Sequence, residues 1–116
     1  MAAPGFFHAS QSYQGTTIDT LTADLDDLDP GPYTVLRVAC NSPFAITGLS
    51  GGAKDRPLWI INVGTENLSL NDEDDGSFRN NRITIGFDAT TPGILTTHEV
   101  AHLWYDDIDF RWRVLK

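Results

Sequence analysis

His98, Glu99 and His102 have the spacing of the His-Glu-x-x-His motif that binds zinc in many metalloproteases. In that chemistry the two histidines hold the ion, and the glutamate acts as general base toward a metal-bound water. The motif requires a helix, because a period of 3.6 residues places side chains four positions apart on one face. On a strand, the same histidines would be about 13 Å apart, too far to share one tetrahedral ion. The secondary structure around the motif therefore decides whether it can hold zinc.

The residues after the motif favour two strands joined by a turn. Segment 110–115 alternates apolar residues with arginines, which is the pattern of a half-buried strand. The apolar residues of segment 100–104 suit one face of a helix equally well, so their periodicity leaves both structures open. A catalytic zinc would also need a third ligand, for which the candidates are Asp106, Asp107, Asp109 and His8. We expect the strand, with no catalytic residue, metal or cofactor, and keep a small zinc hydrolase as an alternative.

A second metal-like pattern occurs in the middle of the chain. Asn71, Glu73 and Asp75 occupy alternate positions before Gly76, as at the start of an EF-hand calcium loop. The twelfth position of such a loop is a bidentate glutamate, but here it is Arg82. A solvated acidic turn is therefore the expectation.

Length, charge and cysteine content exclude several classes of protein. A chain of 116 residues is expected to form one domain with an adequate core, and its single cysteine, Cys40, excludes an intramolecular disulfide. The net charge of −8 repels phosphate backbones, so nucleic acid is not an expected partner. The apolar stretches are only a few residues long, and the first residues lack the pattern of a signal peptide, so no membrane partner is expected.

Short apolar segments separated by Gly, Asn, Asp and Pro predict an all-β fold. The segments are 33–40, 44–47, 57–63, 68–70 and 82–87. Together with the C-terminal pair, they make about seven or eight short strands, as in an antiparallel β-sandwich or jelly roll. Only Thr20–Leu28, whose leucines have helical spacing, offers a short helix as an alternative. We predict a single β-sandwich domain over residues 18–116.

Residues 1–17 are expected to form an extended N-terminal arm, because Pro4 and Gly5 interrupt regular structure. Aromatic residues on such an arm are expected to be covered, which makes Phe6, Phe7 and Tyr13 the interface candidates. They can dock on a neighbouring subunit or fold back on their own domain, and both alternatives stay open.

Large aromatic and charged side chains provide further expectations. Core packing is expected for the three tryptophans, with an interface or a sugar platform as the alternative: Trp59, Trp104 and Trp112. Ion pairs between or along strands are expected for three arginines with nearby carboxylates: Arg82, Arg111 and Arg113 with Glu73, Asp74 or Asp106.

An ordered series of short motifs runs from Ile46 to Val114. It consists of ITGLSGG (46–52), LWIINVG (58–64), LSLN (68–71), ED (73–74), Ser77, NRI (81–83), YD (105–106) and RWRV (111–114). The series resembles a β-rich domain of tailed-phage virion proteins, which include small capsid-associated proteins and the C-terminal parts of tail and head fibres. The resemblance covers the last 70 residues or so and implies a strand, not a helix, at His98–His102.

The residues of this series have an architectural interpretation. The glycines are expected to supply turns with positive φ, and the asparagines to hydrogen-bond turn backbones. The structural positions are Gly48, Gly51, Gly52, Asn62, Gly64, Asn81, Arg82, Tyr105, Asp106, Arg111, Trp112 and Arg113.

The resemblance implies a bacteriophage virion structural protein without enzymatic activity. We expect a capsid decoration (cement) protein that is made in the host cytoplasm, forms a homotrimer and binds the major capsid protein at the capsid surface. Decoration is favoured over a fibre because no repeat or coiled coil precedes the domain. The alternative within phage biology is a fibre or baseplate tip that binds a host surface glycan.

Overall fold

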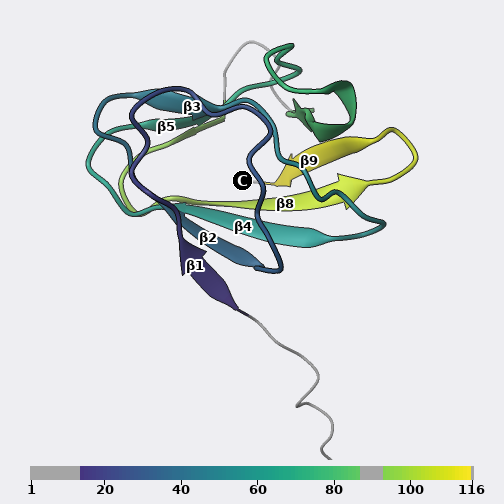
Figure 1. Cartoon of the computed structure of the whole chain (residues 1–116), viewed down its shortest axis with the longest axis horizontal. Coiled ribbons are helices and arrows are strands. Elements are labelled where there is room, and N and C mark those ends of the chain that lie inside the picture. The colour runs from purple at the N-terminus through teal and green to yellow at the C-terminus, as the bar shows by residue number, and fades with distance from the viewer. Residues whose placement is uncertain (1–13, 87–92, 116) are drawn as a thin grey trace, which may run out of the picture.

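Two β-sheets face each other across one apolar core in this computed structural model, which describes residues 14–86 and 93–115 (Figure 1). The larger sheet has the strand order β1-β2-β4-β8-β9-β6, and the smaller sheet has the order β3-β5-β7. The strands are β1 (Gly15–Thr17), β2 (Val35–Val38), β3 (Phe44–Ile46), β4 (Pro57–Asn62), β5 (Leu68–Leu70), β6 (Ile83–Thr84), β7 (Gly93–Leu95), β8 (Val100–Asp106) and β9 (Arg111–Leu115).

The prediction of an all-β fold is confirmed. The described residues contain a short 3-10 helix, η2 (Arg79–Asn81), but no α-helix. No helix in this part of the chain is long and apolar enough to cross a membrane.

The first half of the chain winds as a parallel coil. β2 pairs in parallel with both β1 and β4 in the larger sheet, and β3 pairs in parallel with β5 in the smaller one. The chain crosses from one sheet to the other between β2 and β3 and again between β4 and β5 (Figure 1). Each turn therefore lies on the next in the same direction, with Gly15 opposite Val35 and Val35 opposite Trp59.

The predicted antiparallel arrangement is wrong for this coil and holds only for later pairs. Antiparallel pairing joins β5 to β7, β4 to β8 and β8 to β9, whereas β6 is again parallel to β9. Parallel strands are usually covered on both faces and then have continuous apolar sequences. Here β2 and β4 alternate between buried and partly exposed residues. Their burial therefore alternates as in antiparallel strands, although the sequence of β4 is apolar from Leu58 to Ile61.

The helix considered for Thr20–Leu28 does not form. Its leucines instead make isolated parallel bridges with the next turn of the coil: Leu21 with Cys40, Leu25 with Ile46 and Leu28 with Leu49. The carboxylates between them accept hydrogen bonds from that turn. Asp24 Oδ1 accepts from the backbone N–H of Ala45 at 2.9 Å, and Asp26 Oδ1 from the Thr47 hydroxyl at 2.5 Å. The helix-like leucine spacing arises because the chain bends between inward-facing positions.

Trp112 closes the core between the two sheets and is fully buried, as the sequence predicted for it. Its indole N–H donates to the carbonyl of Leu49 at 2.9 Å. The ring of Tyr105 meets it edge-on with a centroid separation of 5.1 Å, and the Tyr105 hydroxyl donates to the carbonyl of Asn80. These contacts join the C-terminal hairpin to the coil.

Three of the four glycines expected to adopt positive φ do not; only Gly51 does, at 74°. Close packing explains the others. A Cβ on Gly52 would lie 2.2 Å from the Tyr105 ring, one on Gly48 would lie 2.5 Å from the Asn81 carbonyl oxygen, and one on Gly64 would lie 2.9 Å from Ala39. These glycines are needed for close approach between neighbouring segments.

We predict that Gly52→Ala lowers the free energy of unfolding by about 1–3 kcal/mol, because the added methyl group overlaps the packed ring of Tyr105. Urea denaturation of the purified protein measures this change. Gly86→Ala is the matched control, since a Cβ there has no atom within 4 Å. Equal stability of Gly52→Ala and the parent would contradict the packing described.

Candidate functional site: the outer face of the larger sheet

The outer face of the larger sheet has apolar side chains in two neighbouring rows across its strands, which also include His102 and Arg37. Strand register aligns one residue from each of four neighbouring strands: Val35, Trp59, His102 and Leu115. In the adjacent row Ile61 lies opposite Val100. The inward-facing neighbours of these residues already fill the core, so the fold does not require apolar side chains on this outer face.

A stacked aromatic pair lies at the centre of this face. The rings of Trp59 and His102 are parallel within 2°, with centroids 4.2 Å apart. Nε2 of His102 is buried and has no hydrogen-bond partner among the described residues. Aromatic cross-strand pairs of this kind stabilise a sheet and fix ring orientation, so the edge of Trp59 is held in one position.

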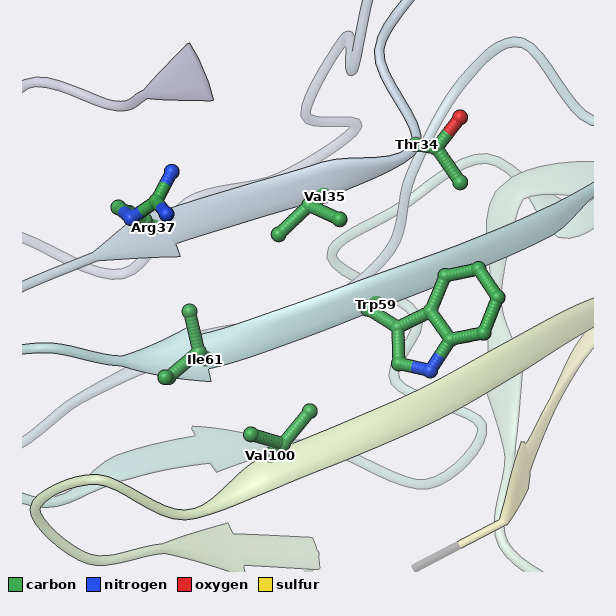
Figure 2. Close-up of a pocket in the computed structure, with 6 residues that line it drawn as sticks. All are labelled: Thr34, Val35, Arg37, Trp59, Ile61 and Val100. Carbon is green, nitrogen blue, oxygen red and sulfur yellow. The ribbon is translucent and has the colours of Figure 1, made fainter. Parts of the chain in front are cut away.

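A shallow groove of about 410 Å³ lies beside Trp59, over β2, β4 and β8 (Figure 2). We call it the sheet groove, and it is lined by Thr34, Val35, Arg37, Trp59, Ile61 and Val100. Four of these six residues are apolar, and Arg37 provides a charge at one end (Figure 2). Such a lining suits an apolar segment of a protein better than a polar small molecule.

Three large apolar side chains of the same face are exposed, and one of them, Val100, also lines the groove. The exposed fractions are 45% for Val100, 37% for Trp104 and 61% for Leu115, which together we call the sheet patch. Because Trp104 is exposed and Trp59 lines the outer groove, the expected core position is wrong for both, and the indole N–H of Trp104 donates to Asp55 at 3.2 Å. Contiguous exposed apolar side chains mark protein interaction sites more often than isolated ones do.

The sheet groove was not predicted from the sequence, although the apolar residues of β4 indicate that both faces of this strand are apolar. Apolar residues occupy consecutive positions in segment 57–63, which predicts a buried strand. In the structure Leu58 and Ile60 face the core, whereas Trp59 and Ile61 face outward. Apolar residues on both faces of a strand indicate either two covered faces or an interaction surface.

The zinc-like motif does not have the geometry that zinc requires. His98 lies in a turn with φ of 70°, and its backbone N–H donates to the Asn62 carbonyl at 2.8 Å. β8 begins at Val100, so the predicted strand is correct for His102 but not for His98 and Glu99. No group of three or more metal-ligating side chains of the required kinds occurs in residues 14–86 and 93–115. The helix that would bring His98 and His102 together is not formed.

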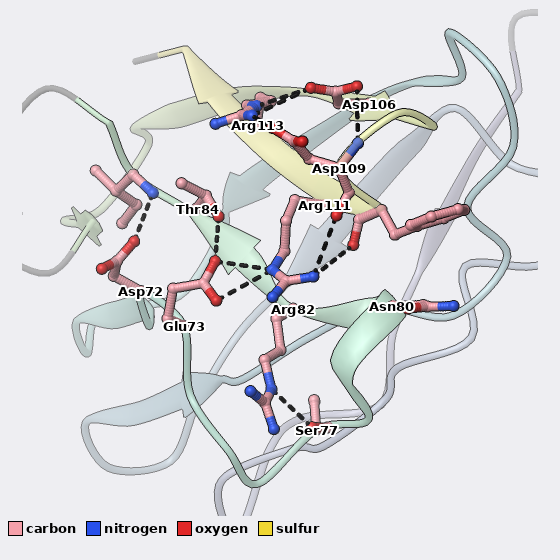
Figure 3. Close-up of polar contacts among 12 residues, drawn as sticks. Asp72, Glu73, Ser77, Asn80, Arg82, Thr84, Asp106, Asp109, Arg111 and Arg113 are labelled. Atoms are coloured by element: carbon pink, nitrogen blue, oxygen red, sulfur yellow. Dashed lines mark hydrogen bonds and ion pairs between the residues drawn. The ribbon is translucent and has the colours of Figure 1, made fainter.

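Ion pairs connect β9 to β8 and to the acidic turn before β6 (Figure 3). Arg111 Nε donates to both carboxylate oxygens of Glu73 at 2.9 and 3.0 Å. Arg113 contacts Asp106 at 3.1 Å and Asp109 at 2.5 Å. The predicted pairing is confirmed for Arg111 and Arg113.

Arg82 behaves differently from the other two arginines, because its Nε donates to the carbonyl of Ser77 at 3.1 Å (Figure 3). Asp74, the other predicted partner, accepts instead from Asn71 Nδ2 and from the backbone N–H of Gly76, both at 2.8 Å. These hydrogen bonds hold the pKa of Asp74 below its usual range. The calcium-like turn is therefore closed by contacts among its own residues.

The carboxyl group of Glu73 is subject to opposing effects. Burial alone would raise its pKa, but hydrogen bonds from Arg111 and Thr84 and the positive charges of Arg111 and Arg82 outweigh that effect. The net result is a pKa below the usual value for glutamate. Glu73 thus stays ionised and links the acidic turn to β6 and β9.

The remaining predicted positions are structural. The Asn62 amide is buried and donates to the carbonyls of Glu66 and Leu95, both at 2.8 Å, while its oxygen accepts from Gly64 N–H. Asn81 Nδ2 donates to the carboxylate of Asp27. The interface candidates Phe6, Phe7 and Tyr13 lie outside the described residues.

No protein-family model, curated protein or solved structure matches this chain. The features of the chain that bear on its function are therefore the outer sheet face and the ordered sequence series.

We predict that Glu73→Gln reduces the loss of stability on acidification. A carboxyl group whose pKa is lowered by folding stabilises the fold above its unfolded pKa of about 4.3 and loses that contribution as the pH falls through the folded value. The stability difference between parent and Glu73→Gln should thus be greatest at neutral pH, at most about 1 kcal/mol because the Glu73 side chain is 39% exposed, and should vanish in acid.

Urea denaturation at pH 7 and at pH 3 measures this dependence. Asp75→Asn is the control, because Asp75 is exposed and has no hydrogen bond or ion pair to another described residue. The same stability difference for Glu73→Gln at both pH values would contradict the pairing.

Proposed function

We propose that this chain is a non-enzymatic structural protein of a tailed-phage virion, which decorates the capsid surface and assembles as a homotrimer. The observation that supports this proposal is the apolar outer face of the larger sheet, with the sheet groove and the sheet patch side by side. The partners would be the major capsid protein and further copies of this chain.

A decoration protein strengthens a shell by burying surface against several subunits, and it needs no chemistry to do so. Rigid apolar side chains surrounded by polar ones are suited to this task, because they lose little conformational entropy on binding. The stacked Trp59 is such a side chain, and Arg37 and Asp55 provide polar groups at the margin of the face.

Charge also favours a shell protein over nucleic acid as the partner. The chain has a net charge of −8, and attraction to a basic region of a capsid would speed binding. We propose synthesis in the host cytoplasm followed by attachment to the outside of the head.

The finer class of the fold is part of the same proposal. We propose a two-sheet sandwich built on a parallel coil, in which the C-terminal hairpin of β8 and β9 extends one sheet.

The alternatives receive less support. A glycan-binding tip would need polar groups around an exposed aromatic ring, and Trp104 with Asp55 provides one such group. The sheet groove is mainly apolar, however, which favours a protein partner. A zinc hydrolase is not proposed, because His98 lies in a turn and His102 on a strand.

We predict that deletion of residues 1–13 leaves a folded domain that no longer binds particles, because the aromatic residues of this segment contribute to attachment. Co-sedimentation with empty capsids measures binding, and circular dichroism checks the fold. Deletion of residues 1–5 is the matched control, since it keeps Phe6, Phe7 and Tyr13 and should keep binding. Full binding after the longer deletion would contradict the role of the segment.

A further inference from the structure

We infer that the sheet groove is the docking site for the N-terminal segment of the same chain, with Phe6 and Phe7 as the side chains that fill it. This inference concerns the free protein and does not depend on the assignment to a phage particle.

The segment begins directly beside the groove. The carbonyl of Gln14 accepts hydrogen bonds from the backbone N–H groups of Thr34 at 2.8 Å and Val35 at 3.3 Å. Both of these residues line the groove. The register that places Gly15 opposite Val35 and Val35 opposite Trp59 fixes this point of departure at the level of the groove.

The segment is long enough to cover the groove. Neighbouring strands are about 4.8 Å apart, so β4, at the middle of the groove, is about 10 Å from β1. Phe7 precedes Gly15 by eight residues, which span up to about 26 Å when extended. The chain can therefore reverse its direction after Phe7 and still place both phenylalanines over β4.

The composition of the segment complements the groove. Residues 1–13 contain no Asp, Glu, Lys or Arg, although 21% of the whole chain is charged. The segment includes two adjacent phenylalanines, and the groove offers the apolar surfaces of Val35, Trp59, Ile61 and Val100. Docking would remove apolar surface from water on both sides without burying an unpaired charge.

The same chain is favoured over a second copy as the source of the segment. A group attached through a short flexible linker has an effective concentration in the millimolar range. A dilute protein solution contains the second copy at micromolar concentration, so docking within one chain is preferred unless the linker cannot reach. The distances above show that it can.

Residue-resolved oxidation by hydroxyl radicals, read by mass spectrometry, tests the inference in the full-length protein. The variant Phe6→Ser/Phe7→Ser removes the two side chains that we infer to cover the groove and should raise the oxidation rate of Trp59 several-fold. Trp104 and Trp112 are internal references, one exposed outside the groove and one buried, and their rates should not change. Gln11→Ser is the matched control within the segment and should leave Trp59 protected.

Two results would overturn the inference. Equal oxidation of Trp59 in the parent and in Phe6→Ser/Phe7→Ser would show that these side chains do not cover the groove. Protection of Trp59 that disappears on dilution would show that a second copy supplies the segment. Protection that is lost in the variant and that persists in protein diluted until light scattering shows a monomer supports docking within the chain, whatever the outcome with capsids.

Discussion

The register between successive turns of the parallel coil is the constraint on which the rest of the structure depends. Because Val35 lies opposite Trp59, Leu36 lies opposite Ile60, and inward and outward positions remain aligned from turn to turn. The same register continues through β8, where Ala101 pairs with Ile60 and His102 with Trp59. This one register therefore produces both the stacked apolar side chains of the core and the apolar row on the outer face. A slip of one residue between neighbouring strands would move the core side chains to the outer face and the outer ones to the core.

Polar side chains fix this register where the chain turns. Asp24 and Asp26 accept hydrogen bonds from the next turn, and Asp27 accepts from Phe78 N–H and from the Asn81 amide. Asn62 joins the end of β4 to the loop before β5 and to β7. Much of the acidic composition of the first turn thus has an architectural role, whereas the apolar outer face contributes nothing to the core between the two sheets. This contrast is what makes the outer face a candidate for function.

The positions of several strands could be predicted from alternation, as for β5 and β9, and the burial of Trp112 followed from its place in an alternating segment. β1 and β7 were missed because their sequences, GTT and GIL, show no alternation of apolar and polar residues, and their extended form depends on neighbouring strands. Parallel pairing could not be predicted, since partners such as Val35 and Trp59 are distant in sequence and periodicity does not specify a partner. The same limit applies to the sheet groove, which three separate strands form. For the zinc motif the sequence predicted more than the structure contains. The spacing of His98 and His102 suggested zinc binding, but the turn at His98 does not bring the two side chains together.

The central claim is that the outer face of the larger sheet is an assembly surface. The most direct test is the native mass of the purified chain by light scattering, for the parent and for Trp104→Ser, which removes the largest side chain of the sheet patch. The account predicts a parent mass three times the 12.8 kDa of the monomer and a shift of the variant toward the monomer. A parent protein that stays monomeric at every concentration, or a Trp104→Ser variant that remains fully trimeric, would contradict it.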